Sequence, residues 1–319
     1  MNRPYPVLAA ALAGALLPSA SALAHGFAGD RFFPATIQTD DPFVADEGSL
    51  PTVAKNPTDA AGTQSYTVES DLSKRLTPST DILAQYEWNY FQPRGAPAHY
   101  GFGSLLTGLQ YQLFINAPHE AMALVGLNEI WGHTGAVNQG GAANYTTIEP
   151  AFDWGKGFGD LPDSLSWFQP LAVTGNLFVD FPARVNNDGM VNQTVFNAGF
   201  AIEYSLEYLE HQVKDVGLSW PFDRLIPLVE ITSATPINRG TVAGSSSPFN
   251  GFITNNEGRA TTGVIAPGII WSGQYYQIAA EAVLPYGEGQ GHGVGGLIQL
   301  HFYYDDIFPQ SFGRPTFGD

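Results

Sequence analysis

The sequence predicts an all-β chain that folds as an antiparallel up-and-down transmembrane β-barrel of about 12 strands, with an irregular N-terminal segment. Three observations favour this class. Long segments alternate apolar with polar side chains, whereas strands of soluble proteins cluster near about 5–6 residues. Aromatic residues gather near the ends of these segments, as they do at membrane interfaces. The polar faces carry carboxylates and amides, which would be costly in a dry core.

The first residues predict export. Residues 1–24 hold an early cation, Arg3, an apolar run, and a small-x-small site at Ala22-Leu23-Ala24. This is the pattern of a secretory signal peptide, whose cleavage would leave His25 as the new N-terminus. No later stretch is long and apolar enough for a membrane-spanning helix.

The composition fits a wall with lipid on one side. Of the 319 residues only 13% are charged, against roughly 25% in ordinary globular proteins. The formal net charge is −17 and cysteine is absent, but the chain is long enough to close a large sheet without disulfides. So few cations cannot neutralise phosphates, and we therefore expect no nucleic-acid partner.

The chain divides into four parts in order. Residues 1–24 form the signal peptide, and residues 25–62, rich in Pro, Asp and Ala, form an irregular segment that could plug or strap the barrel. Residues 63–304 form the barrel, and residues 305–319 a C-terminal tail. The predicted strands cover 64–74, 81–91, 103–115, 120–132, 146–154, 171–181, 195–208, 225–234, 262–273, 275–286 and 293–304. Because bacterial single-chain barrels have even strand numbers, we expect about 12.

The stretch DILAQYEWNYF, Asp81 to Phe91, shows the alternation most clearly. Ile82 and Trp88 share a face that we expect to meet lipid, and the opposite face would meet water in the lumen. The same argument gives a set of lumen-facing polar candidates: Gln85, Glu87, Asn89, Gln110, Gln112, Glu203, Glu207, Glu230 and Glu281. Their carboxylates predict either a cation-attracting lumen or a structural network paired with arginines, and both interpretations stay open.

Two stretches resemble a known family. GFGSLLTGLQYQLFINAPHEAMALVGLNEIWGHTG, residues 101–135, is similar to the paired-strand signature of the meta-pathway phenol-degradation outer-membrane family, and residues 155–179 repeat a similar pattern. Ser104 and Gln110 depart from it, where the family often has Asp and Lys. The resemblance implies a transporter-like outer-membrane barrel that passes small hydrophobic or aromatic compounds. Bacterial barrels usually end their last strand with an aromatic residue that resembles an assembly signal, whereas here residues 305–319 follow the last strand. An aromatic signal near Phe302 or Tyr304, before this tail, would make the barrel-assembly machinery an expected partner.

Signatures of enzymes and cofactors are weak. The run GHGVGG, residues 291–296, fits a dinucleotide fingerprint but precedes a strand instead of opening a helix. The sequence has no GxSxG, no P-loop and no cysteine nucleophile, so we expect neither an enzyme nor a cofactor. The remaining alternative is a secreted or outer-membrane binding or structural protein that could bind copper. Its metal ligand would be His25, through the α-amine and a ring nitrogen.

Together these patterns predict a protein of the Gram-negative outer membrane. It would sit in outer-membrane lipid and let small, hydrophobic or aromatic molecules pass.

Overall fold

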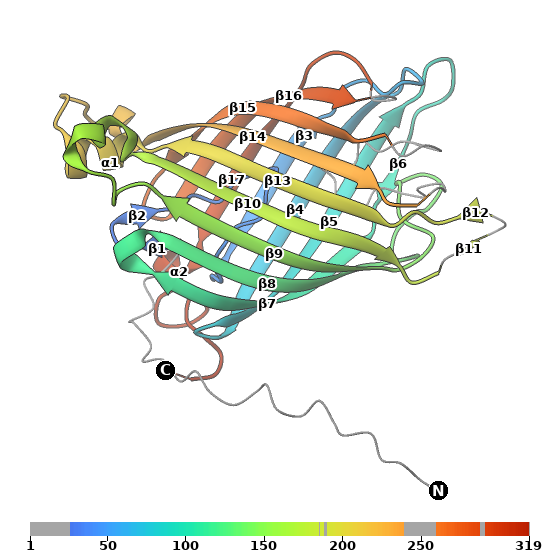
Figure 1. Cartoon of the computed structure of the whole chain (residues 1–319). Coiled ribbons are helices and arrows are strands. Elements are labelled where there is room, and N and C mark those ends of the chain that lie inside the picture. Colours follow the sequence, from blue (N-terminus) through green and yellow to red (C-terminus); the bar gives the residue numbers. More distant parts are fainter. Residues whose placement is uncertain (1–25, 185, 188–189, 239–259, 288–290, 319) are drawn as a thin grey trace, which may run out of the picture.

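Twelve long antiparallel strands close into a barrel in the computed structural model (Figure 1). The structure describes residues 26–184, 186–187, 190–238, 260–287 and 291–318. Each wall strand pairs with the next along the chain, and the last pairs with the first, so the described wall has no free edge. The predicted fold class, an up-and-down barrel of 12 strands, is confirmed.

The wall strands are long, with lengths from 9 to 14 residues. They are β3 (Glu47–Lys55), β4 (Gln64–Thr77), β5 (Thr80–Gln92), β7 (Leu105–Asn116), β8 (Ala121–Trp131), β9 (Thr147–Gly157), β10 (Leu171–Pro182), β13 (Val195–Tyr204), β14 (Leu225–Pro236), β15 (Thr262–Ser272), β16 (Tyr276–Gly287) and β17 (Gly295–Tyr303).

The stretch from Asp81 to Phe91 lies within β5, and its alternation is present there. Ile82 is 44% exposed on the outside of the barrel, while Glu87 and Asn89 are buried on the inside. On the outer surface, aromatic rings contact one another near the strand ends, as in the pair Tyr66 and Tyr90 at a centroid distance of 6.2 Å. The period of two therefore separates an apolar outer surface from a polar inner one, as a barrel in lipid requires.

One strand was not expected. The sequence argument assigned residues 25–62 to an irregular segment, but residues 47–55 form β3, which closes the barrel between β17 and β4. Register shifts interrupt its pairing with both neighbours, and Pro51 lies within it. A bulge breaks the alternation by which a strand is recognised, so β3 could not be found from its period.

Short elements cover the two ends of the barrel (Figure 1). One end is the end where β3 begins and β17 finishes. It carries the hairpin of β1 (Phe27–Ala28) and β2 (Arg31–Phe32). It also carries the short helices of the described residues, which are the 3-10 helices Ala117–His119, Asp163–Phe168 and Phe222–Arg224, α1 (Leu206–Tyr208), the π-helix Leu209–Val213 and α2 (Tyr304–Ile307). The opposite end carries β6 (His99–Phe102) and the small hairpin of β11 (Asn186–Asn187) and β12 (Met190–Val191). Among the described residues, no helix has the length and apolarity of a membrane span.

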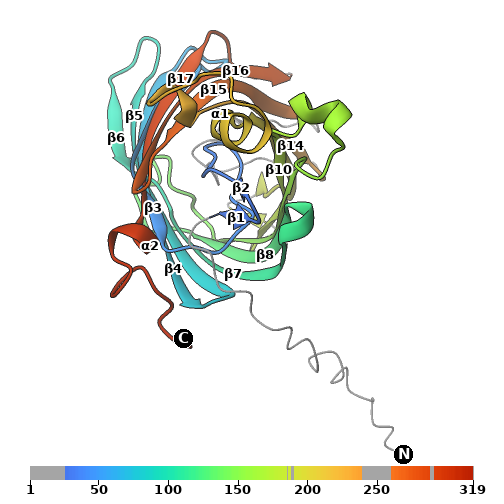
Figure 2. The ribbon, with the colours of Figure 1, turned by 90° about the vertical axis from the view of Figure 1, so that its left-hand side faces the viewer.

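The chain before β3 lies inside the barrel. Figure 2 looks along the barrel from the end that carries α1 and shows β1 and β2 within the ring of strands. We call residues 26–46 the plug segment. Phe33 and Ala45 in this segment are fully buried. The inner faces of the strands therefore contact the plug segment, whereas the alternation of the strands alone predicts water at these faces.

Candidate functional site: the plugged lumen

A single carboxylate holds the middle of the plug segment. Glu230 projects inward from β14 and is fully buried. Its Oε2 accepts a hydrogen bond from the backbone N–H of Ile37 at 3.0 Å, and its Oε1 accepts from the backbone N–H of Gln38 at 3.0 Å and of Thr39 at 2.9 Å. The Thr39 hydroxyl adds a fourth bond at 2.9 Å. Three successive amides converging on one carboxylate make a nest of the kind that binds anions.

Two amide side chains hold the plug segment on either side of this point. The Gln112 Oε1 on β7 accepts from the backbone N–H of Val44, and its Nε2 donates to the Pro42 carbonyl, both at 3.0 Å. On β16, the Gln277 Nε2 donates to the Ala35 carbonyl at 2.5 Å. The wall therefore satisfies backbone groups that a buried irregular segment would otherwise leave unpaired.

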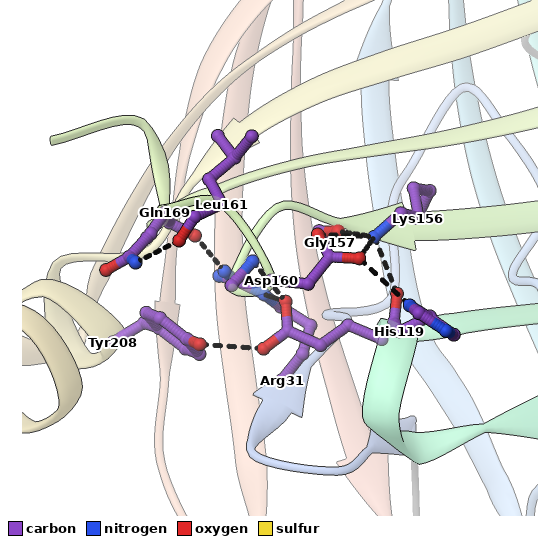
Figure 3. A network of polar contacts seen from close by, with 10 residues as sticks. Arg31, His119, Lys156, Gly157, Asp160, Leu161, Gln169 and Tyr208 are labelled. Carbon is purple, nitrogen blue, oxygen red and sulfur yellow. Dashed lines mark hydrogen bonds and ion pairs between the residues drawn. The ribbon is translucent and has the colours of Figure 1, made fainter. Parts of the chain in front are cut away.

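A second cluster fixes the β1–β2 hairpin at the barrel mouth (Figure 3). Arg31 is 1% exposed, and its Nε donates to Glu120 Oε2 at 3.3 Å. Its guanidinium carbon lies 3.8 Å from the centre of the Tyr208 ring, and the Tyr208 hydroxyl donates to Glu120 Oε1 at 2.7 Å. We call these three residues the mouth latch. It joins the plug segment to the β7–β8 turn and to α1, which are far apart in the sequence.

The latch reaches a third connection as well. Arg31 donates through Nη1 to the Pro170 carbonyl at 3.0 Å and through Nη2 to the Gln169 carbonyl. The N–H of Gly159 donates to Glu120 Oε2 at 2.8 Å. Each of the three guanidinium nitrogens of Arg31 thus donates a hydrogen bond, which offsets part of the cost of its burial. Burial lowers the pKa of Arg31, while the charge of Glu120 opposes that effect.

Where the plug segment joins β3, a group of ion pairs connects it to β4 and to α2 after the last strand. Asp46 Oδ2 lies 2.9 Å from Arg75 Nε, and Asp46 Oδ1 lies 2.5 Å from Lys74 Nζ. Arg75 Nη2 also lies 2.5 Å from Asp305 Oδ1, just beyond the last strand. Burial raises the pKa of Asp305 to about 7, with Arg75 acting in the opposite direction.

An apolar cluster lies on one side of the lumen, beside the buried polar side chains Glu230, Gln277 and Glu281 of the same strands. Buried aliphatic residues on the inner face of β3 and of β14 to β17 contact Ile37 of the plug segment, and Phe32 packs against them. We call this surface the apolar strip; its wall residues are Ala54, Ile226, Leu228, Val264, Ile270, Ala279, Val283 and Leu297. The other side of the lumen, from β4 to β10, carries most of the buried carboxylates and amides. The lumen is therefore amphipathic.

The predicted lumen residues occupy different places. Glu87 and Asn89 are buried, and Asn89 accepts from the Thr67 hydroxyl at 2.8 Å and donates to the Gly140 carbonyl at 2.9 Å. Gln85 and Gln110 line an internal cavity of about 140 Å³ beside the plug segment.

The strands β13, β14 and β16 place three of the predicted carboxylates inside the barrel. Glu203 accepts from the Thr174 hydroxyl at 3.1 Å. Glu230 binds the plug segment, and Glu281 is buried nearby on β16.

Glu207 corrects the sequence argument. In the sequence the alternation continues through the predicted strand 195–208, but β13 ends at Tyr204. Glu207 lies in α1, and Ser205 caps this helix. The Ser205 side chain accepts from the backbone N–H of Tyr208 at 3.1 Å, a local bond that competes with continuing the strand. Glu207 Oε1 lies 2.5 Å from Arg224 Nη1, so Glu207 is not one of the polar side chains that face the lumen.

The proposed metal ligand cannot be placed. His25 and the signal peptide fall outside the described residues. Within the described part of the chain, no group of three His, Asp or Glu side chains is arranged to hold a metal ion.

Sequence reasoning missed most of the plug contacts. Arg31, Glu120 and Tyr208 stand in three separate connections, and no period links them. Gln277 carried a usable signal, because it alternates with apolar residues along β16 as Glu281 does.

Comparison with solved structures places this fold among outer-membrane barrels. The outer membrane channel COG4313 from Pseudomonas putida F1 is 11% identical and aligns with a TM-score of 0.56, over 83% of this chain and 97% of that chain. At this identity the likeness shows the fold alone. The NanC porin aligns at 9% identity with a TM-score of 0.44, over 81% of this chain and 98% of that chain.

 LpxR from Salmonella typhimurium (10% identity, TM-score 0.41, 81% of this chain, 99% of that chain) is similarly distant. No protein-family model and no curated protein matches the chain, so the phenol-degradation family stays a prediction.

Proposed function

We propose that this protein is an outer-membrane channel for small hydrophobic or aromatic compounds, and that the plug segment closes it in the state described here. The observation that carries the proposal is the amphipathic lumen. The apolar strip along β14 to β17 offers a surface for an apolar solute, and the opposite side offers polar groups. A core with a purely structural role would not need apolar and polar side chains on opposite sides of the lumen.

The way in which the plug segment is held supports a removable closure. Glu230, Gln112 and Gln277 bind it through its backbone, in bonds that water can replace when the segment leaves the lumen. Its apolar side chains Phe33 and Phe43 pack against Met122 and Ala172 of the wall. Displacing the segment would join the cavity of about 140 Å³ to the cleft of about 700 Å³ at the barrel mouth.

A reversible lock would test this closure. The chain has no cysteine, so a designed pair would form the only disulfide. A Cβ added at Gly199 on β13 would lie 2.8 Å from Thr39 Cγ2, close to the separation of about 3 Å between a Cβ and the far sulfur of a disulfide. It would also overlap Asn176 Oδ1, so the end of the Asn176 side chain must turn aside. The double variant Thr39→Cys/Gly199→Cys therefore joins the plug segment to the wall.

We expect the oxidised double variant to show no conductance in planar bilayers, and reduction by dithiothreitol to restore the wild-type level. Each single cysteine variant is the control, because it carries the same substitution without the bond. Conductance that continues unchanged in the oxidised double variant would show that solutes do not need the plug segment to move. The compound class is tested by phenol uptake into cells that produce the wild-type or the locked barrel, with glucose as the polar comparison.

A further inference from the structure

The internal cavity between the plug segment and the wall carries an unusual number of carboxylates in its lining. Six carboxylates border it: Asp40 and Asp41 from the plug segment, Glu47, Glu69, Asp71 and Glu149 from the wall. Among the described residues that line the cavity none is Lys or Arg. The only basic side chain is His301, whose two ring nitrogens already face Ser49 Oγ at 3.0 Å and Glu47 Oε2 at 3.2 Å.

Protein donors satisfy only part of this acceptor capacity. Asp41 accepts from the N–H of Thr36 at 3.0 Å, and Asp71 accepts from the N–H of Ser49 at 2.9 Å. Glu149 accepts from Asn128 Nδ2 at 2.9 Å. An ionised carboxylate offers about four lone-pair sites, so each of these groups can accept further bonds.

Three buried amide oxygens point to a ligand independently of the carboxylates. Asn128, Asn176 and Gln299 line the cavity and are 6%, 3% and 5% exposed. The Oδ1 of each asparagine and the Oε1 of the glutamine have no hydrogen-bond partner among the described residues. A buried acceptor without a donor costs about 1–3 kcal/mol, so a donor-rich guest would be favoured here.

We infer that this cavity binds the ammonium group of a small organic cation. An ammonium offers three N–H donors and a positive charge, which complements a cavity of acceptors and carboxylates. Direct metal chelation fits less well, because no three acidic or histidine side chains of the described residues are arranged around one point. A cation bound here would lie between Asp40 and Asp41 of the plug segment and Glu69 and Asp71 of the wall. The inference does not depend on permeation, since the site exists in the closed barrel.

Thermal unfolding of the detergent-solubilised protein tests the inference with methylammonium chloride as the probe. We expect a saturable rise in the unfolding midpoint as methylammonium is added. Tetramethylammonium chloride at the same concentration carries the charge without an N–H donor and should have no such effect. An equal rise with tetramethylammonium would mean that the effect is charge screening, and a rise with calcium chloride alone would mean that the cavity binds a metal ion. Either result, or no rise with any probe, would overturn the inference.

Variants locate the effect in the cavity. We expect Glu69→Gln/Asp71→Asn to weaken methylammonium binding by about tenfold or more, because two charge-assisted bonds are lost. Glu207→Gln, in α1 and outside this cavity, is the matched control and should bind as the wild type does. Should the double variant fail to fold, hydrogen exchange on the wild type decides: methylammonium must slow exchange of the amides of residues 36–41. Methylammonium binding without conductance would leave this inference standing while the channel proposal fails.

Discussion

Thr39 donates both its backbone N–H and its hydroxyl to the same atom, Glu230 Oε1, at 2.9 Å each. The residues are 191 positions apart in the chain. Glu230 would be an uncompensated buried carboxylate if the plug segment left, unless water or a solute took its place. The closed state of the barrel and the charge of this one side chain are therefore linked.

Replacing Glu230 by alanine should loosen the plug segment. The variant loses four hydrogen bonds to a carboxylate, and we expect the free energy of unfolding to fall by about 2–4 kcal/mol. Hydrogen exchange should accelerate at Ile37, Gln38 and Thr39, measured by mass spectrometry. Glu207→Ala removes a half-exposed carboxylate of α1 that pairs with Arg224, away from the three amides, and is the control. Unchanged exchange at the three amides would show that other contacts alone hold the segment.

The mouth latch should respond differently to three substitutions. Arg31→Ala leaves Glu120 buried without its cation, which we expect to cost about 3–5 kcal/mol of stability. Arg31→Lys keeps the charge but loses the fork to the two carbonyls, and should fall between the wild type and Arg31→Ala. Tyr208→Phe keeps the ring beside Arg31 and loses one hydrogen bond, for a cost of about 1 kcal/mol. Urea unfolding in detergent measures all three, and the reverse order would contradict the latch.

Strand positions were predictable because lipid outside and polar groups inside impose a period of two. That period located β5 almost to the residue and gave the start of β13, and it gave the inward direction of Glu230 and Glu281. It failed at β3, where a bulge interrupts it, and after Tyr204, where Ser205 starts a helix turn. Local side-chain bonds override the period at such points.

The contents of the lumen were not predictable from the period. Sequence shows that Gln112 and Glu230 face inward, but not whether water or protein meets them there. The plug segment pairs its backbone with these side chains across separations of 68 residues and more, and such contacts leave no local pattern. The mouth latch is similar, because Arg31 and Glu120 meet only once the barrel has closed.

The glycine at position 135 should be required by the loops at the far end of the barrel. A Cβ at Gly135 would overlap the carbonyl oxygens of Gly103 and Phe102, which belong to the backbone and cannot turn aside. We expect Gly135→Ala to lower the yield of folded, heat-modifiable barrel. Gly126→Ala on β8 is the matched control, since its nearest neighbours would lie at 3.6 Å. Equal yields of the two variants would show that the loop positions adapt freely.

Asp305 should make stability depend on pH in a defined direction. Burial raises its pKa to about 7 in the folded protein, against an ordinary value of 3.8. The folded state therefore holds the proton more tightly than the unfolded state. Its favourable contribution is complete below about pH 4 and is lost as the pH rises through about 7. Asp305→Asn cannot titrate, so the stability difference between wild type and variant should shift against the wild type over this range. Urea unfolding at closely spaced pH values measures that difference, which cancels the titration of all other groups. A difference that stays constant from pH 4 to 7, or that shifts in favour of the wild type, would mean that Arg75 outweighs burial at this carboxyl.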